Sequence, residues 1–216
     1  MLELIAKGGL LMWPILIFAV GAIAVFLERL FHYHRAQIHT NDFVNGILNS
    51  LKRGNVSEAI GTCKATAGPV AQVVMAAVVN HDRSREEIRE AVQDTARTEV
   101  TRLERNLPIL VTIAQIAPLL GFLGTVWGMI QVFMVIEKTQ QTTAGQLAGG
   151  VWQALLTTAG GLVVAIPSYI AYNYLVSRVQ NLVLDMEKAA NETVQYLVRK
   201  EEEDGGEQAS KVVALQ

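Results

Sequence analysis

Charged side chains are missing from three long stretches of the chain and are frequent between them. The uncharged stretches cover residues 8–27, 106–136 and 139–177. Each reaches the length of about 20 apolar residues that a helix needs to cross the hydrocarbon core of a bilayer. In lipid the backbone must form its hydrogen bonds within the segment, so these stretches are expected to be helical. The pattern therefore predicts transmembrane helices over 9–27, 109–136 and 147–175.

The polar segment between the first two spans carries short helical patterns separated by turn signals. A cap at Thr40-Asn41-Asp42 predicts a helix that stops at Gly54-Asn55. A second helix is expected near 56–67, before Gly68-Pro69, and a third over about 70–81. With such small helices, no separate globular domain is expected in this segment.

Two helices are expected to be much longer than a membrane crossing. Ser84 and Glu87 have the spacing of a capping box, and no strong stop follows until Ile136. Such a helix would be about 80 Å long at 1.5 Å per residue. Pro108 and Pro118 are expected to bend this helix without ending it.

The third span is expected to continue in the same way. Thr142 or Thr143 is a candidate cap, and helix-forming sequence continues to about residue 203. The predicted organisation is an external N-terminus (1–8), a cytoplasmic helical loop and stalk (28–108), an external loop (137–146), a cytoplasmic helix (176–203) and a disordered tail (204–216).

Composition and charge agree with a membrane protein and give its orientation. The chain is 51% hydrophobic and 18% charged, with a mean hydropathy of +0.30. Basic residues near the span ends mark the cytoplasmic side. One side has only Lys7 and Lys138, whereas the other has five arginines: Arg29, Arg35, Arg102, Arg105 and Arg178. The N-terminus is therefore predicted outside and the C-terminus in the cytoplasm.

Several classes of function find no support in the residues. Neither a glycine-rich phosphate loop nor a nucleophile–histidine–acid set is visible, so no enzyme is predicted. Basic residues are balanced by acids, which argues against nucleic-acid binding. The four histidines are too scattered to predict a metal site: His32, His34, His39 and His81. The single cysteine, Cys63, is expected to be a reduced, inert cytosolic thiol, and the first span lacks the flanks of a cleaved signal peptide.

Small and polar residues gather on one face of the second span. At 100° per residue, six residues lie within about 60° of the Thr125 direction: Pro118, Gly121, Phe122, Thr125, Gly128 and Met129. Gly124 and Gly128 form a GxxxG spacing, which lets another helix approach closely.

The third span repeats the theme. Gly149, Gln153, Thr157 and Gly161 recur at every fourth position, and Thr158 lies about 100° round from Thr157. Threonine hydroxyls often bond back to their own helix, but a glutamine amide in lipid needs a partner. We interpret the two faces as the lining of an ion pathway. Because hydroxyls and amides do not titrate near neutral pH, any carboxylate in it must come from another chain.

Two stretches resemble a known family. Residues 117–128 (APLLGFLGTVWG) are similar to the second span of the ExbB and TolQ proteins, and residues 152–167 (WQALLTTAGGLVVAIP) to the third. The chain is identified as a member of the MotA/TolQ/ExbB proton-channel family, nearest to ExbB. The resemblance implies Thr125 and Thr158 as pathway threonines and Pro118 as the span-two proline. We assign Pro118, Gly121, Gly124, Gly128, Gly161 and Pro167 to lumen shape and helix packing.

The resemblance also implies an assembly. Such proteins form homopentamers in the bacterial inner membrane, around two single-span ExbD-like helices that carry the titrating aspartate. Ion flow then does work on a TonB-like or other envelope protein, with no bound cofactor. The transported ion is H⁺ by family precedent, with Na⁺ as the alternative.

One position departs from the family. ExbB and TolQ sequences have a glutamate early in the third span, where this chain has Gln153. Two other interpretations stay open: a passive membrane scaffold whose polar residues only join helices, and a TolQ-like or motility motor of the same family.

Overall fold

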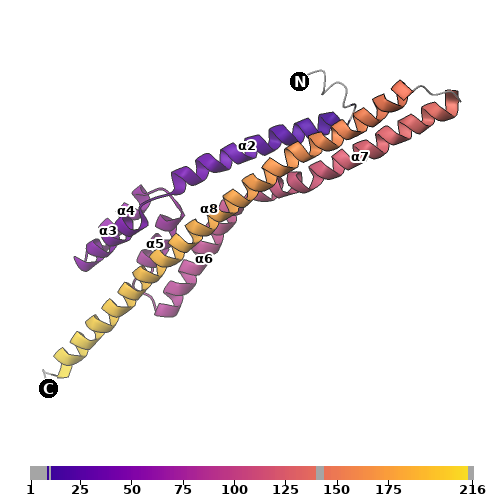
Figure 1. The fold of residues 1–216 in the computed structure, drawn as a ribbon. Helices are drawn as coiled ribbons and strands as arrows, with labels where there is room; N and C mark the ends of the chain where they lie inside the picture. The colour runs from indigo at the N-terminus through magenta and orange to yellow at the C-terminus, as the bar shows by residue number, and fades with distance from the viewer. Residues whose placement is uncertain (1–8, 10, 140–143, 214–216) are drawn as a thin grey trace. The chain divides into compact units, whose positions relative to one another are not determined.

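The computed structural model describes residue 9, residues 11–139 and residues 144–213, and every regular element in these ranges is a helix (Figure 1). The helices are α2 (Met12–Ala36), α3 (Thr40–Lys52), α4 (Val56–Ala65), α5 (Pro69–Val79), α6 (Arg85–Glu104), α7 (Leu107–Thr139) and α8 (Ala144–Val213). They form two compact units. The first comprises the described parts of 1–30 and 106–176, and the second comprises those of 31–105 and 177–216.

The first unit carries the apolar segments. Three helical stretches are long and apolar enough to cross a membrane, and they include α2 and most of α7 and of α8. Large apolar side chains stand exposed on all three, among them Val20 (69%), Phe122 (66%) and Val163 (71%). Such faces are stable only against lipid or another apolar surface. The expected all-helical architecture with three long apolar helices is confirmed.

The second unit has a hydrophobic core of its own, which the sequence pattern did not predict. Helix α5 is apolar on nearly every side, and seven of its residues are buried. Leu51 of α3, Ile88 of α6 and Met186 of α8 are also fully buried in this unit. A helix that is apolar all round must be covered by neighbours. The short helices therefore pack with α8 into a compact unit, and the expectation of no separate domain is wrong.

The long helix expected from 84 to 136 is broken. Helix α6 ends at Glu104 and α7 starts at Leu107, with Asn106 between them at φ 68°. Asparagine tolerates this left-handed conformation better than most residues, and its amide contacts the Glu28 carboxylate at 3.4 Å. Pro108 then lies in the first turn of α7, where a missing N–H costs nothing. The bend predicted at Pro108 is therefore a helix start.

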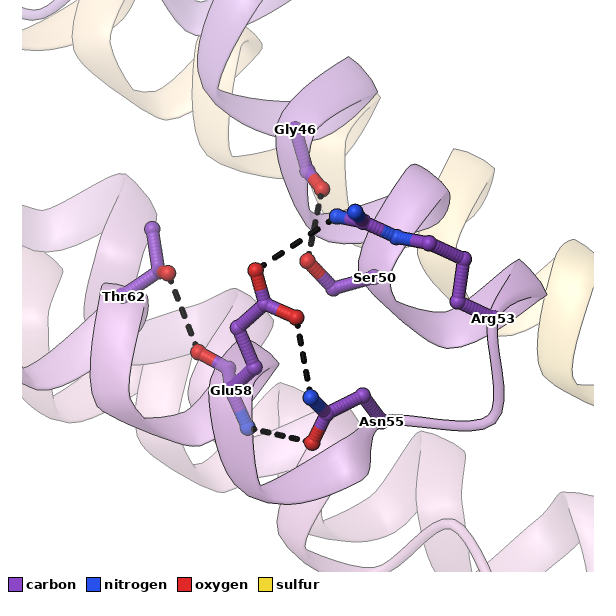
Figure 2. Close-up of polar contacts among 6 residues, drawn as sticks. All are labelled: Gly46, Ser50, Arg53, Asn55, Glu58 and Thr62. Atoms are coloured by element: carbon purple, nitrogen blue, oxygen red, sulfur yellow. Dashed lines mark hydrogen bonds and ion pairs between the residues drawn. The ribbon is translucent and has the colours of Figure 1, made fainter.

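Helix α4 begins at a polar cap that Figure 2 shows in full. The Asn55 side chain accepts a hydrogen bond from the Glu58 amide at 3.2 Å, and donates one to the Glu58 carboxylate at 3.0 Å. The same carboxylate pairs with Arg53 at 3.4 Å. The turn 53–55 is thereby held between α3 and α4, as the Gly54-Asn55 stop predicted.

The other helix ends agree with the predictions to different degrees. The capping box of Ser84 and Glu87 is present. Helix α3 instead begins at Thr40, with His39 at its N-cap and no capping side chain, so the predicted Thr40–Asp42 cap is wrong. Thr142 and Thr143 lie outside the described residues. Helix α8 continues to Val213, past the end expected near 203, although Gly205 and Gly206 are poor helix formers.

Burial of Cys63 makes a prediction about reactivity. Its side chain is fully buried in α4, and burial raises the pKa of the thiol to about 11, from 9.0. We expect iodoacetamide at pH 8 to leave Cys63 unmodified in the folded protein and to alkylate it in denaturant, because the thiolate is the reactive form. Equal rates in both states would contradict the buried placement.

The same shift predicts a pH dependence of stability. A pKa raised on folding contributes stability below pH 9 that is lost as the pH rises from 9 towards 11. A Cys63→Ala variant should lack this contribution. The difference in free energy of unfolding between the wild type and this variant should therefore shrink as the pH rises from 9 towards 11.

Candidate functional site

Helices α7 and α8 approach each other along a row of glycines. We call Gly121, Gly124 and Gly128 of α7, with Gly150 and Gly161 of α8, the glycine seam. A side-chain carbon on Gly121 would meet the Thr158 backbone, and one on Gly128 would meet Ala154. Rising numbers on α7 meet falling numbers on α8, so the two helices are antiparallel within the first unit (Figure 1).

The seam leaves no room for a methyl group. A Cβ on Gly161 would lie 2.5 Å from the Ala117 carbonyl oxygen, and one on Gly128 would lie 2.9 Å from the Ala154 Cβ. The backbones therefore touch almost directly, as small residues allow in membrane helices. The packing roles predicted for Gly121, Gly124, Gly128 and Gly161 fit this arrangement.

Thr157 is buried in the seam. Its side chain is 2% exposed and fills the space beside Gly124, where a Cβ would overlap its hydroxyl. Its hydroxyl donates to the Ala154 carbonyl at 2.8 Å and lies 3.3 Å from that of Gln153. Such back-bonding satisfies the hydroxyl within its own helix. The geometry gives Thr157 a packing role, and its assignment to an ion pathway stays a prediction without support from its position.

Thr158 makes a different contact. Its hydroxyl donates a hydrogen bond of 2.9 Å to the Gly121 carbonyl, across the gap between the two helices. The Thr158 side chain is half-buried, whereas that of Thr157 is buried. Because its proton is committed to Gly121, Thr158 faces a ligand in this state as an acceptor.

Thr125 lies on α7, one turn after Gly121. Its hydroxyl donates to the Phe122 carbonyl at 2.6 Å, and its side chain is half-buried. In the regular pattern of α7, the backbone N–H of Thr125 is bonded to the Gly121 carbonyl. That carbonyl therefore receives both the Thr125 amide and the Thr158 hydroxyl. The structure therefore places the Thr158 hydroxyl one helical turn from Thr125, while the Thr125 hydroxyl itself bonds to Phe122.

Gln153 lies elsewhere. Its side-chain amide packs against Gly9, which has φ +71°, and a Cβ on Gly9 would overlap the amide nitrogen. Gly160, two turns later on α8, contacts Met12 of α2. These contacts turn Gln153 towards the start of α2, and Thr158 towards α7. The single polar lining expected from Gln153, Thr157 and Thr158 is therefore divided among three surroundings.

The remaining predicted residues fall outside the seam. Pro118 and Pro167 lie inside continuous helices, where each leaves one backbone carbonyl without its helical partner. Pro167 borders an apolar cavity of about 740 Å³ between α2 and α8. Phe122 and Met129 are exposed on α7. The stripe predicted around Thr125 thus consists of buried glycines and exposed apolar residues.

Neither span supplies a titrating group. Residues 106–136 and 139–177 contain no Asp, Glu, Lys or Arg. Within the described ranges, no group of three metal-binding side chains occurs. A hydroxyl pair bonded to backbone carbonyls can accept and relay hydrogen bonds, but cannot hold a charge.

Comparison with known proteins decides the family. A profile of the MotA/TolQ/ExbB proton channel family matches residues 64–188, which include α7 with Thr125 and the part of α8 with Thr158. The chain belongs to this family. It is therefore related to channel proteins, and the match brings no evidence of catalysis.

Individual relatives agree. A Synechocystis sp. protein named ExbB-like 3 is 33% identical over 169 residues, which cover 77% of this chain and 80% of that protein. The TolQ protein of Haemophilus influenzae is 41% identical over 87 residues, covering 40% of this chain and 38% of its own. The ExbB protein of Pseudomonas putida is 34% identical over 132 residues, covering 59% and 40%.

Sequence reasoning missed two contributors to the site. Gly150 lies against Val132 in the seam, and the Gly121 carbonyl accepts the Thr158 bond. The sequence did contain a signal for Gly150, because Gly149-Gly150 repeats the glycine pair Gly160-Gly161. No sequence signal could mark the Gly121 carbonyl, because every residue has a backbone carbonyl.

The seam predicts an asymmetric response to added methyl groups. Gly161→Ala should force α8 away from the Ala117 carbonyl and lower the thermal stability of the detergent-solubilised protein, by about 1–3 kcal/mol. Gly149→Ala is the matched control on the same helix, since nothing lies within 4 Å of its added Cβ. Equal melting temperatures for both variants would contradict the close approach.

Proposed function

We propose that the chain is an ExbB-like subunit of an ion-driven motor in the bacterial inner membrane. Five copies form a sleeve around two ExbD-like helices, with the N-terminus in the periplasm and the C-terminus in the cytoplasm. Ion flow through this sleeve does work on a TonB-like or other envelope protein. Family membership, three membrane-length helices and the arginine distribution support this proposal.

The observation that carries the proposal is the hydrogen bond from the Thr158 hydroxyl to the Gly121 carbonyl, one helical turn before Thr125, whose own hydroxyl bonds to the Phe122 carbonyl. These hydroxyls, in spans without Asp, Glu, Lys or Arg, make a neutral polar point in an apolar wall. Such a point suits a carboxyl group brought by another chain.

The chemistry follows from the hydroxyl geometry. A carboxylate in an apolar lumen is costly when ionised, so its pKa rises and it remains protonated there. The protonated carboxyl can donate to the free lone pairs of Thr158. Away from the threonines the acid must stay neutral, whereas beside them it can exchange its proton through a short polar path. Each proton that crosses 100 mV releases about 2.3 kcal/mol, which biases the direction of stepping.

The mismatch between five subunits and two acids strengthens the directional bias of stepping. With five threonine pairs around two carboxyl groups, the two acids cannot face equivalent walls at once. One acid is then engaged while the other waits. The TolQ-like and motility machines share this logic and differ in the partner that they drive.

A passive scaffold is the second candidate, and one observation favours it. Thr125 and Thr157 both satisfy their hydroxyls within their own helices, as residues used only for packing do. The scaffold predicts that assembly fails with Gly124→Leu and that function survives Thr125→Ala combined with Thr158→Ala. The motor predicts that the threonine variant assembles and is inactive.

Thr158 provides the sharpest test of the motor. In proteoliposomes with the ExbD-like partner at fixed membrane potential, Thr158→Val should keep the shape and lower ion flux at least about tenfold. Thr158→Ser should keep most of the flux, because it keeps the hydroxyl. Thr112→Val is the matched control, since the Thr112 hydroxyl is exposed and bonds only to Pro108 of its own helix.

The same preparation identifies the ion. Flux that persists in Na⁺-free buffer assigns the pathway to H⁺, and flux that requires Na⁺ assigns it to sodium. Wild-type flux from Thr158→Val would refute the proposed role of the hydroxyl, and assembly is checked separately by size-exclusion chromatography.

A further inference from the structure

A basic cleft opens in the second unit. It has a volume of about 350 Å³ and three walls: the last turn of α2, the start of α5 and the last turn of α6. The first wall carries His32 and Arg35, and the third carries Glu99 and Arg102. All of these residues belong to the same compact unit.

The walls of the cleft are held together by specific contacts. The Tyr33 hydroxyl donates a buried hydrogen bond of 2.6 Å to the Leu103 carbonyl, which joins α2 to α6. Gly68, at φ +127°, lies so close to α2 that a Cβ would be 2.9 Å from the Ala36 carbonyl oxygen. A side chain at Gly68 would therefore both strain the backbone and push the walls apart. Contacts between its walls thus fix the shape of the cleft.

The charge inside the cleft is not balanced. Glu99 is the one acid among its lining residues, and it pairs with Arg102 at 3.4 Å. Arg35 has no ion pair or hydrogen bond with any residue in the described ranges. One full positive charge therefore remains, with the His32 ring beside it. The N-terminus of α5 adds the positive end of the helix dipole. Its N-cap residue, Gly68, has no side chain to bond the first backbone N–H groups of α5.

The place of Arg35 in the chain points to the source of an anion. His32 and Arg35 come five and eight residues after the first uncharged stretch ends at Leu27. The arginines that flank the spans predict that this side is cytoplasmic. Basic pockets next to membrane helices on this side suit the phosphates of anionic lipids. The planar guanidinium of arginine matches a phosphate with two parallel hydrogen bonds.

We propose that this cleft binds the phosphate of an anionic phospholipid headgroup, with Arg35 as its main contact and Arg102 as the second. The site would hold the second unit to the inner leaflet at the end of α2. The inference requires membrane insertion of α2 and does not depend on the ion pathway, so the two proposals can fail separately.

The test uses the full chain, purified in detergent with its partner, and isothermal titration calorimetry. The probes are dihexanoyl phosphatidylglycerol, dihexanoyl phosphatidylcholine and inorganic phosphate. Wild-type protein should bind the phosphatidylglycerol more tightly than the phosphatidylcholine or the inorganic phosphate. Arg35→Gln should weaken this binding about tenfold, because a charge-assisted contact is lost. Arg35→Lys should recover part of it.

Arg83→Gln is the matched control, because Arg83 is exposed, lies outside the cleft and loses the same charge. It should bind the lipid like the wild type. Melting temperatures check that every variant is folded, and Arg35 has no ion pair or hydrogen bond within the described residues whose loss would unfold the chain. Unchanged lipid binding in Arg35→Gln would overturn the site. Inorganic phosphate that binds as tightly as phosphatidylglycerol would overturn the lipid as its occupant.

Discussion

The close approach of two helix backbones is the constraint on which the rest of the site depends. Thr158 reaches the Gly121 carbonyl at 2.9 Å only because glycines let α7 and α8 meet without intervening side chains. In lipid, helices gain no hydrophobic energy by associating, so packing and interhelical hydrogen bonds must supply the stability. The bond from Thr158 to Gly121 therefore joins the helices and also fixes a hydroxyl next to the predicted ion path.

The charge pattern predicted the architecture, because charge in hydrocarbon is costly and an apolar run of about 20 residues without charge is typical of a membrane-spanning helix. The breaks were harder to predict. Asn106 ends one long helix through a left-handed backbone conformation, which composition does not announce. The core of the second unit was missed for a similar reason. The apolar character of α5 was visible, but the sequence pattern did not show that α4 and α6 pack against it.

The site shows the same division. Periodicity placed Gly121, Thr125 and Gly128 on one face of α7, and the Gly124–Gly128 spacing predicted a close helix approach, which fits the contacts of both glycines with α8. It could not tell which edge of that face meets α8, because a helical wheel contains no neighbour. Thr157 and Thr158 differ by one position and by 100°, yet one fills the seam beside Gly124 and the other bonds across it. Gln153 was grouped with them by spacing alone, and packs against Gly9.

The absence of charge from the two spans has a physical logic. A carboxylate in the seam would change its hydration with every protonation step, and its desolvation cost would act directly on helix packing. Hydroxyls bonded to carbonyls carry no such penalty, so α7 and α8 can stay packed while the charge state of a partner changes. In the proposed motor, Gln153 stands where the family resemblance implies a glutamate, so the membrane segments of this chain would supply shape and lone pairs, and the titrating group would belong to the partner. A rigid neutral wall beside a moving acid would let an ion gradient drive motion of the acid and leave the wall in place.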